Sequence, residues 1–356
     1  MVSLCILNIK TSLRRSDSVD SQKHGWIDFA RLLAAFLVVL AHVCDWGHEP
    51  WFWGANYYTL SRIAVPFFFL TGGFLLLSKV EDLWTFFSKR AARIVIPFLA
   101  WSVYYDIQNT RPFAEAGVTF DAIAGMVVRI LSVPREAHLW FFYSLIGLYL
   151  VTPILRVFVA NAKESELHYF IGLWFFVKPI LLLVEGFTPI RIGFEVYYAA
   201  GYLGYFLLGY YLSRMEITPR LLRFAFFFFV LSYLFTFAVF YFDLPPAHNE
   251  VVLRDYPSLN IVLMSLGAFV LVRYLADKVP GSWIRLSTKA SPVIFGIYLI
   301  HPMLLRWMAL GMETIGLDPY AGYSLLMIPA IALAAFLIAW GIVALALKVP
   351  VLRRIF

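Results

Sequence analysis

The sequence predicts an all-α protein that crosses a membrane about ten times, with both termini in the cytoplasm. Hydrophobic residues make up 62% of its 356 residues and charged residues only 14%, which is far more apolar than a soluble core requires. Several apolar segments reach the roughly 18 residues that a helix needs to cross a bilayer. The 34 Phe, 20 Tyr and 11 Trp residues suit surfaces that face lipid and the membrane interface.

The distribution of basic residues supports this topology. If ten helices alternate across the membrane, twenty Lys and Arg residues fall in segments on the side of the two termini, and seven fall on the other side. An excess of Lys and Arg marks the cytoplasmic side of a membrane protein, so both termini are expected there. The same bias accounts for the net charge of +7 without a nucleic-acid partner.

The chain begins with a polar stretch, residues 1–24, which has no apolar run of the signal-peptide kind and is expected to be a disordered cytoplasmic tail. Residues 25–350 are expected to form a single transmembrane domain, and residues 351–356 a short cytoplasmic tail. Four basic residues mark the segment 78–93 as a cytoplasmic loop, and an amphipathic helix is expected at 120–133 on the other side.

The transmembrane helices are predicted from apolar runs that are separated by short breaks containing Pro or Gly. They cover residues 26–46, 57–77, 93–108, a segment that starts at His138, 167–184, 196–213, 221–242, 257–275, 291–312 and 323–347.

The first helix, WIDFARLLAAFLVVLAHVCDW, carries ionisable residues at membrane depth, where they are rare and usually pair or act inside the protein. Arg31 and His42 are eleven residues apart, which is about 1100° around the helix, so they share one face although about 16 Å separates them along the axis. They predict a polar seam through the helix. Asp28 and Arg31 either form an ion pair that neutralises both charges, or Arg31 is free to bind a donor.

Two short motifs allow a structural and a functional interpretation. Gly72 and Gly73, in VPFFFLTGGF, leave room for the close approach of either a neighbouring helix or a ligand. Arg90 and Arg93 are three residues apart at the start of a helix. They are either ordinary cytoplasmic charges or a clamp for phosphate groups.

Three of the seven histidines, His42, His138 and His301, lie in apolar helices or begin one. Desolvation favours the neutral imidazole, so His42 could accept the proton of a hydroxyl as a general base. His301 precedes Pro302 and could instead complete the backbone hydrogen bonding that a proline disrupts. The sequence has no phosphate-binding glycine loop, dinucleotide fingerprint or metal-ligand cluster, and its two cysteines predict no disulfide framework.

Taken together, these motifs resemble the membrane-bound acyltransferase-3 family over nearly the whole chain and in the same order. The resemblance rests on Asp28, Arg31 and His42 in the first helix, on VPFFFLTGGF, on Arg90 and Arg93 before IVIPF, on HLWFFYSLIGLYLVTPILR and on YLIHP. Members of that family are mostly bacterial inner-membrane O-acyltransferases that move acetyl groups from acetyl-CoA to surface or exported glycans.

The resemblance implies roles for individual residues. His42 would be the catalytic histidine, Arg31 an essential arginine, and Arg90 and Arg93 part of the acyl-CoA site. Gly72 and Gly73 would let the pantetheine arm pass close to the backbone. Candidates for supporting roles are Asp28, His138, Tyr298 and His301. Thr71 stands where the family usually has Ser, and it keeps the hydroxyl.

The implied enzyme takes acetyl-CoA, or another acyl-CoA, as donor substrate and needs no permanently bound cofactor and no metal. Its acceptor would be a hydroxyl of an exopolysaccharide, an O-antigen or a lipid-linked sugar, reached in the bacterial inner membrane among its lipids and beside glycan-assembly proteins. The alternative is a transporter or assembly component for lipid-linked glycans without acyl-transfer activity. The sequence shows no inverted repeat of the kind that many transporters have.

Overall fold

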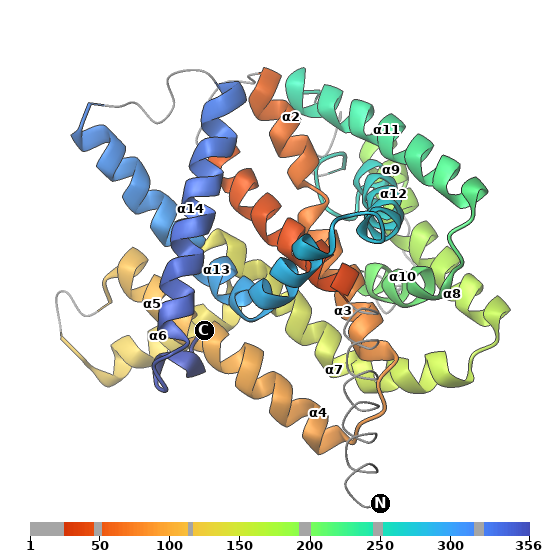
Figure 1. Ribbon diagram of the computed structural model, residues 1–356. Helices are drawn as coiled ribbons and strands as arrows, with labels where there is room; N and C mark the ends of the chain where they lie inside the picture. Colours follow the sequence, from red (N-terminus) through yellow and green to blue (C-terminus); the bar gives the residue numbers. More distant parts are fainter. Residues whose placement is uncertain (1–24, 46–51, 113–116, 192–200, 245–251, 317–323) are drawn as a thin grey trace, which may run out of the picture.

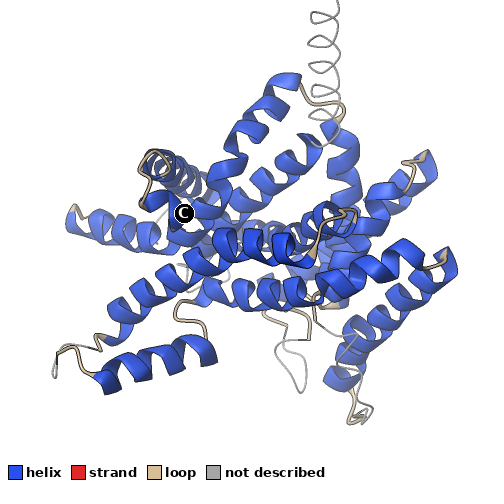
Figure 2. Cartoon of the chain, turned by 90° about the horizontal axis from the view of Figure 1, so that it is seen from below, coloured by secondary structure: helices blue, strands red, loops and turns tan. Residues whose placement is uncertain are grey.

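The structure, a computed structural model, describes residues 25–45, 52–112, 117–191, 201–244, 252–316 and 324–356. This part of the chain consists of helices and loops without a strand (Figure 2), which confirms the predicted all-α class. The predicted N-terminal tail, 1–24, lies outside the described residues.

The helices follow one another along the chain with short connections. They are the first helix (Gly25–Cys44), α2 (Phe52–Ser61), α3 (Ala64–Leu77), α4 (Leu83–Arg90), α5 (Ile96–Thr110), α6 (Phe120–Ser132), α7 (Trp140–Asn161), α8 (Glu164–Phe175), α9 (Leu181–Phe187), α10 (Leu203–Arg214), α11 (Pro219–Tyr241), α12 (Leu259–Ala276), α13 (Gly281–Thr314) and α14 (Ser324–Ala346). Short π-helical segments, Ala91–Val95 and Phe176–Ile180, join α4 to α5 and α8 to α9.

Eight helical segments in the described part of the chain are long and apolar enough to cross a membrane. A multi-pass membrane protein is therefore confirmed. Two of the predicted spans are not among the eight, namely α5, which continues the charged α4, and α10, which has 12 residues. The count of ten spans and the cytoplasmic termini stay predictions.

The membrane-spanning segments differ in how deeply they are buried. In the first helix, α2–α3, α12 and α13, half or more of the residues are buried, whereas in α7, α8–α9, α11 and α14 a third or fewer are buried. The first helix runs through the middle of the molecule, and α11 lies along its edge (Figure 1). The ionisable side chains of the first helix are therefore held inside the protein.

Two predicted boundaries were wrong because polar residues continue a helix. Residues 83–93 were expected to be loop, but α4 begins after Asp82, whose side chain accepts a hydrogen bond from the backbone N–H of Thr85 at 2.9 Å and so caps the helix. Similarly, α13 begins ten residues before the predicted start at 291. Both helix starts mix polar residues with exposed apolar ones such as Trp84 and Trp283, and long apolar runs alone do not detect such turns.

The predicted second span is broken in the structure into α2 and α3, between Ser61 and Ala64. Pro66 explains the break, because it lacks the N–H that would bond the carbonyl of Arg62, four residues earlier. At the break the N–H of Arg62 donates to the carbonyl of Thr59, three residues earlier, at 3.2 Å. The break places Arg62 inside the bundle instead of on a continuous helix surface.

The predicted amphipathic helix at 120–133 corresponds to α6. Arg129, in α6, and Arg135, which follows it, both pair with the buried Asp106 of α5 at 2.7 Å. Its apolar side chains, including Phe120 and Leu131, are exposed, as expected of a helix at a membrane interface.

The closest backbone approach among these helices joins α3 to α10. A Cβ atom at Gly73 would lie 1.8 Å from the carbonyl oxygen of Phe206, and one at Gly209 would lie 1.9 Å from the carbonyl oxygen of Leu70. Only glycine fits at these positions, since such contacts lie far inside the van der Waals distance. Small residues at helix interfaces are a common means of packing helices in membranes.

We expect Gly73→Ala to destabilise the protein by about 1–3 kcal/mol, because the added methyl must push α3 and α10 apart. The thermal unfolding midpoint of the purified protein in detergent measures this. The matched control is Gly147→Ala in α7, where a Cβ meets nothing within 4 Å and the midpoint should hold or rise slightly. Equal midpoints for the two variants would contradict the packing described here.

Candidate functional site

Two cavities inside the bundle share one wall residue, Tyr298, and the first helix contributes one ionisable side chain to each. Arg31 lines the first cavity and His42 lines the second, so we call them the Arg31 cavity and the His42 cavity. Both side chains face the protein interior from the same helix, as the predicted polar seam requires. Arg31 and His42 lie at different positions along the first helix and therefore line different cavities.

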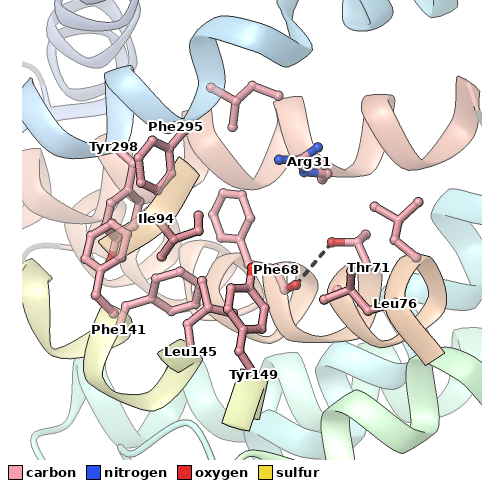
Figure 3. A pocket seen from close by; sticks show the side chains of 14 residues that line it. Arg31, Phe68, Thr71, Leu76, Ile94, Phe141, Leu145, Tyr149, Phe295 and Tyr298 are labelled. Carbon is pink, nitrogen blue, oxygen red and sulfur yellow. Dashed lines mark hydrogen bonds between the residues drawn. The ribbon is translucent and has the colours of Figure 1, made fainter. Parts of the chain in front are cut away.

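The Arg31 cavity has a volume of about 160 Å³ and mainly apolar walls (Figure 3). Its walls come from the first helix, α3, α7, α13 and the segment between α4 and α5. The lining residues are Arg31, Phe68, Thr71, Gly72, Leu75, Leu76, Ile94, Phe141, Phe142, Leu145, Tyr149, Ile294, Phe295 and Tyr298. Among these described lining residues, only Arg31 carries a charge.

Arg31 keeps most of its hydrogen-bonding capacity free. Its Nη1 donates a long hydrogen bond of 3.4 Å to the hydroxyl of Ser291 in α13. Asp28 does not come within the 4.0 Å of an ion pair, although its charge still acts on Arg31, so of the two alternatives for Arg31 the ion pair is not formed. Since a guanidinium has five N–H donors, Arg31 can bind a polar group inside the cavity.

The two adjacent glycines have different surroundings: one lines the Arg31 cavity and the other packs against a helix. Gly72 lines the Arg31 cavity, where a Cβ would lie 3.1 Å from the ring of Phe206. Gly73 faces α10, so helix packing explains this residue and leaves no room for a ligand. The hydroxyl of Thr71 donates to the carbonyl of Phe67 at 2.7 Å and to that of Phe68 at 3.2 Å, the bond drawn in Figure 3.

The His42 cavity has a volume of about 180 Å³ and is more polar. It lies beside the break between α2 and α3. Its lining residues are Val38, Ala41, His42, Asp45, Tyr58, Ser61, Arg62, Ala64, Val65, Ala137, His138, Trp140, Tyr256 and Tyr298. A carboxylate, a guanidinium and two imidazoles therefore face the same small space.

The structure brings the three singled-out histidines together. The ring centroids of His42 and His301 are 4.8 Å apart, and those of His138 and His301 are 5.2 Å apart. His138 and His301 are buried, with 2% and 0% of their surface exposed, whereas His42 is half-buried and lines the cavity. His42 is therefore the member of the cluster that a substrate reaches most directly.

Backbone carbonyls fix the tautomers of two of these rings. The Nδ1 atom of His42 lies 2.9 Å from the carbonyl of Val38, and that of His301 lies 2.7 Å from the carbonyl of Tyr298. A carbonyl can only accept, so each Nδ1 carries a proton and each Nε2 carries a lone pair. In the described chain the buried Nε2 of His301 has no hydrogen-bond partner. His42 can thus accept a proton at Nε2.

Tyr298 lines both cavities and forms the wall between them. Its hydroxyl donates to the carbonyl of His138 at 2.8 Å, which ties α13 to the start of α7. The rings of Phe141 and Phe142 pack on it with centroid distances of 5.4 and 5.5 Å. Tyr298, one of the predicted supporting residues, is thus a wall residue that the Arg31 and His42 cavities share.

A cluster of basic residues around Glu81, the Glu81 cluster, lies next to the Arg31 cavity. The carboxylate of Glu81 pairs with Arg90 at 2.8 Å, Arg156 at 3.0 Å and Lys89 at 3.3 Å. Partial burial alone would raise the pKa of Glu81, but the hydrogen bonds from Arg156 and Lys89 and the charge of Arg90 bring this pKa below its usual 4.5. Three cations around one carboxylate leave a positive surplus.

The Glu81 cluster contacts the cavity wall through Arg156, whose Nε donates to the carbonyl of Leu76 at 2.8 Å. The guanidinium groups of Arg90 and Arg156 both lie over the ring of Phe86, at 4.2 and 4.6 Å from its centroid. Arg93 is exposed on the π-helical turn, outside this cluster. The two predicted phosphate-binding arginines therefore differ: Arg90 is held in place, and Arg93 is free to move.

The described residues contain no group of three His, Cys, Asp or Glu side chains arranged to hold a metal ion. The expected absence of a metal stays a prediction. The chemistry that this part of the chain offers is hydrogen bonding, charge and proton transfer by imidazole.

A model of a family described as an acyltransferase domain, acyltransferase family 3, matches residues 24–346. The match covers almost the whole chain. The protein belongs to the acyltransferase-3 family. This membership confirms the resemblance seen in the sequence.

Two curated relatives of this family member are both described as amino-acid racemases of Enterococcus faecalis. One is 27% identical over 165 residues, which is 42% of this chain and 20% of the relative. The other is 21% identical over 296 residues, which is 78% of this chain and 40% of the relative. The chain therefore spans two fifths or less of their length. No solved structure matches it.

Sequence reasoning missed Arg62 and Asp45, which line the His42 cavity, and Arg156, which contacts the wall of the Arg31 cavity at Leu76. Arg62 lies within the predicted second helix, so the rule that singled out Arg31 would have found it. Asp45 and Arg156 had no such signal, because each lies at or near a helix end, where charge is common. Only the fold shows that Arg156 shares Glu81 with Arg90.

We expect Glu81→Gln to lower the thermal unfolding midpoint in detergent at pH 7, with a loss of about 1–3 kcal/mol, because three cations lose their shared acceptor. Since the pKa of Glu81 is lowered by folding, its contribution is present above pH 4.5 and is lost as the pH falls further.

The difference between the parent protein and Glu81→Gln should therefore shrink below pH 4.5. Glu164→Gln is the matched control, because the Glu164 side chain is 78% exposed and its removal should change little. A midpoint for Glu81→Gln equal to that of the parent at pH 7 would contradict the role of this carboxylate.

Proposed function

We propose that the protein is a membrane O-acyltransferase that moves an acetyl or other short acyl group from acyl-CoA to a hydroxyl of a glycan. The observation that carries the proposal is that the Arg31 cavity and the His42 cavity share the wall residue Tyr298. The first cavity offers Arg31 and the neighbouring Glu81 cluster for a donor, and the second offers an imidazole for an acceptor. Family membership supports acyl transfer, and acetyl-CoA and the glycan are the finer part of the proposal.

The donor would enter beside the Glu81 cluster and reach into the Arg31 cavity. Acyl-CoA carries several phosphate charges, and arginine binds phosphate through two parallel hydrogen bonds. Arg93 is exposed and Arg90 lies at the positive cluster, so both can meet phosphates without leaving the helix. The narrow, apolar Arg31 cavity suits the pantetheine arm, with Gly72 keeping its wall open. The CoA thioester is a substrate and no resident cofactor is needed.

His42 would act on the acceptor hydroxyl. Its Nε2 lone pair takes the hydroxyl proton while the oxygen attacks the thioester carbonyl, the C–O bond forms and the C–S bond breaks. The imidazolium then returns the proton to the CoA thiolate, which leaves as a thiol. In a second route the same Nε2 first attacks the thioester carbonyl, the C–S bond breaks and the CoA thiolate leaves. The hydroxyl oxygen then takes the acyl group from Nε2, and its proton passes to the thiolate, which leaves as a thiol. Both routes need the Nδ1 proton held by Val38.

The setting we propose is the bacterial inner membrane, with glycan-assembly proteins as neighbours. The experiment uses the purified protein in detergent with labelled acetyl-CoA and lipid-linked or free glycans, and it measures label transferred to the glycan. Transfer without vesicles or a gradient excludes a purely transport role. No transfer to any glycan, with acetyl-CoA bound, would refute the proposal.

Replacing His42 tests the base. We expect His42→Gln and His42→Ala to fold normally and to lower acyl transfer by about 10²-fold or more, because neither side chain accepts a proton at neutral pH. The rate of labelled ester formation measures this. The control is His168→Gln, since His168 is half exposed and lines neither cavity. A folded His42→Gln that transfers at the parent rate would rule out the catalytic role.

The two predicted donor arginines should respond differently. We expect Arg93→Ala to weaken acetyl-CoA binding about tenfold without a loss of stability, whereas Arg90→Ala should lose both affinity and stability because it leaves the Glu81 cluster. Lys at either position should recover little, since a point charge does not match the planar fork. Equilibrium dialysis of labelled acetyl-CoA and thermal unfolding measure the two effects.

The matched control is Arg285→Ala, which removes another exposed arginine that lies away from both cavities. It should leave the acetyl-CoA dissociation constant unchanged. If the double variant of Arg90 and Arg93 binds as tightly as the parent, the donor assignment is wrong.

A further inference from the structure

The His42 cavity contains two charged side chains that the proposed chemistry does not use. Asp45 follows the first helix, and Arg62 lies in the break between α2 and α3. Broken membrane helices commonly line binding sites, because the broken region exposes polar groups to a cavity instead of lipid. A ligand of this cavity must therefore suit both a carboxylate and a guanidinium.

Arg62 is held in place without a carboxylate in contact. Its guanidinium lies 3.9 Å from the ring centroid of Tyr256 and 5.6 Å from that of Tyr58, and it donates to the backbone carbonyl of Arg254. Asp45 and Asp255 act on it by charge but lie beyond the 4.0 Å of an ion pair. Its buried Nε has no hydrogen-bond partner in the described chain. A charge held like this at membrane depth is a candidate binding group.

The charges that face this cavity do not favour an anion. Within the cavity lining, the negative charge of Asp45 offsets the positive charge of Arg62. Asp255, which lies outside the lining, also acts on Arg62 by its charge, and Arg254 is already paired with Asp243. A uronate or phosphate group would therefore meet repulsion as well as attraction. An uncharged polar ligand avoids this cost and can use both kinds of group.

Hydroxyl groups match the remaining chemistry. Each hydroxyl both donates and accepts, so Arg62 can donate to one and Asp45 can accept from another. The rings of Trp140 and Tyr256 stack at 5.5 Å and give the cavity an aromatic wall, which suits the apolar C–H face of a sugar ring. At about 180 Å³ the cavity holds about six water molecules, the space of one small ring.

We propose that the His42 cavity binds one uncharged, hydroxylated ring of the acceptor, a neutral pyranose, between Arg62, Asp45 and the aromatic wall of Trp140. This inference rests on the proposed acyl transfer and names the class of acceptor for it. Arg62 and Asp45 are positioning residues: they hold the ring so that one of its hydroxyls points to His42.

The test measures binding and transfer separately. The probes are two matched pairs, the methyl glycosides of glucose and glucuronic acid and those of galactose and galacturonic acid. Equilibrium dialysis of each labelled glycoside against the purified protein, without acetyl-CoA, gives binding. Acetylation at saturating acetyl-CoA gives kcat and KM. The parent should bind at least one neutral glycoside more tightly than its uronide.

Asp45→Asn and Arg62→Gln should each raise the KM and the dissociation constant for that neutral glycoside about tenfold or more, with kcat and acetyl-CoA affinity changed far less. The matched controls are Asp121→Asn and Arg111→Gln, which change exposed residues away from the cavity. Asp45 is itself exposed, so Asp45→Asn should fold even if Arg62→Gln does not. Arg62→Lys keeps the charge and should recover part of the affinity.

Three results would overturn the inference: no saturable binding of either neutral glycoside, preference for the uronides, or unchanged glycoside affinity in a folded Asp45→Asn. Binding of a neutral glycoside without acetylation would refute the proposed acyl transfer to glycans and leave this binding site standing. If neither substitution changes the KM or kcat of acetylation, the binding site is refuted and the proposed acyl transfer is not.

Discussion

Ionisable side chains at membrane depth are stable only where protein or water surrounds them, and this constraint shapes the interior of the molecule. The chain meets it by turning Arg31, His42 and Arg62 towards cavities in the bundle instead of lipid. The most buried segments are those that carry or surround these groups, while the outer helices present apolar side chains. The polar interior and the apolar exterior thus both follow from the free-energy cost of exposing ionisable groups to lipid.

Backbone chemistry positions the polar groups as much as side-chain packing does. Pro66 breaks a helix and moves Arg62 inward. Gly73 and Gly209 let α3 and α10 touch, which fixes the wall that carries Thr71 and Gly72. A single missing N–H and two missing side chains therefore shape helices that line the cavities. None of these residues needs to meet a substrate to matter for the site.

Much of the fold was predictable from the sequence because apolar length is a local property. The helices, the amphipathic α6 and the shared face of Arg31 and His42 all follow from spacing along one segment. Contacts between distant segments were not predictable. Nothing local places His301 beside His42, or Arg156 beside Glu81, because those contacts depend on how whole helices pack. The alternative that paired Asp28 with Arg31 was wrong because residues that are close in sequence can still have different partners, and Arg31 bonds Ser291 of another helix.

The aromatic ring of Tyr298, which both cavities share, also matters for how well the membrane blocks ions. A continuous wet path through the bundle would let protons and small ions run down the membrane potential, which is worth about 2.3 kcal/mol per charge for each 100 mV. Tyr298 narrows such a path, because its ring is only 6% exposed and packed by Phe141 and Phe142, and its hydroxyl donates to a backbone carbonyl. A buried aromatic ring at the point that the two cavities share therefore limits how much water can link them.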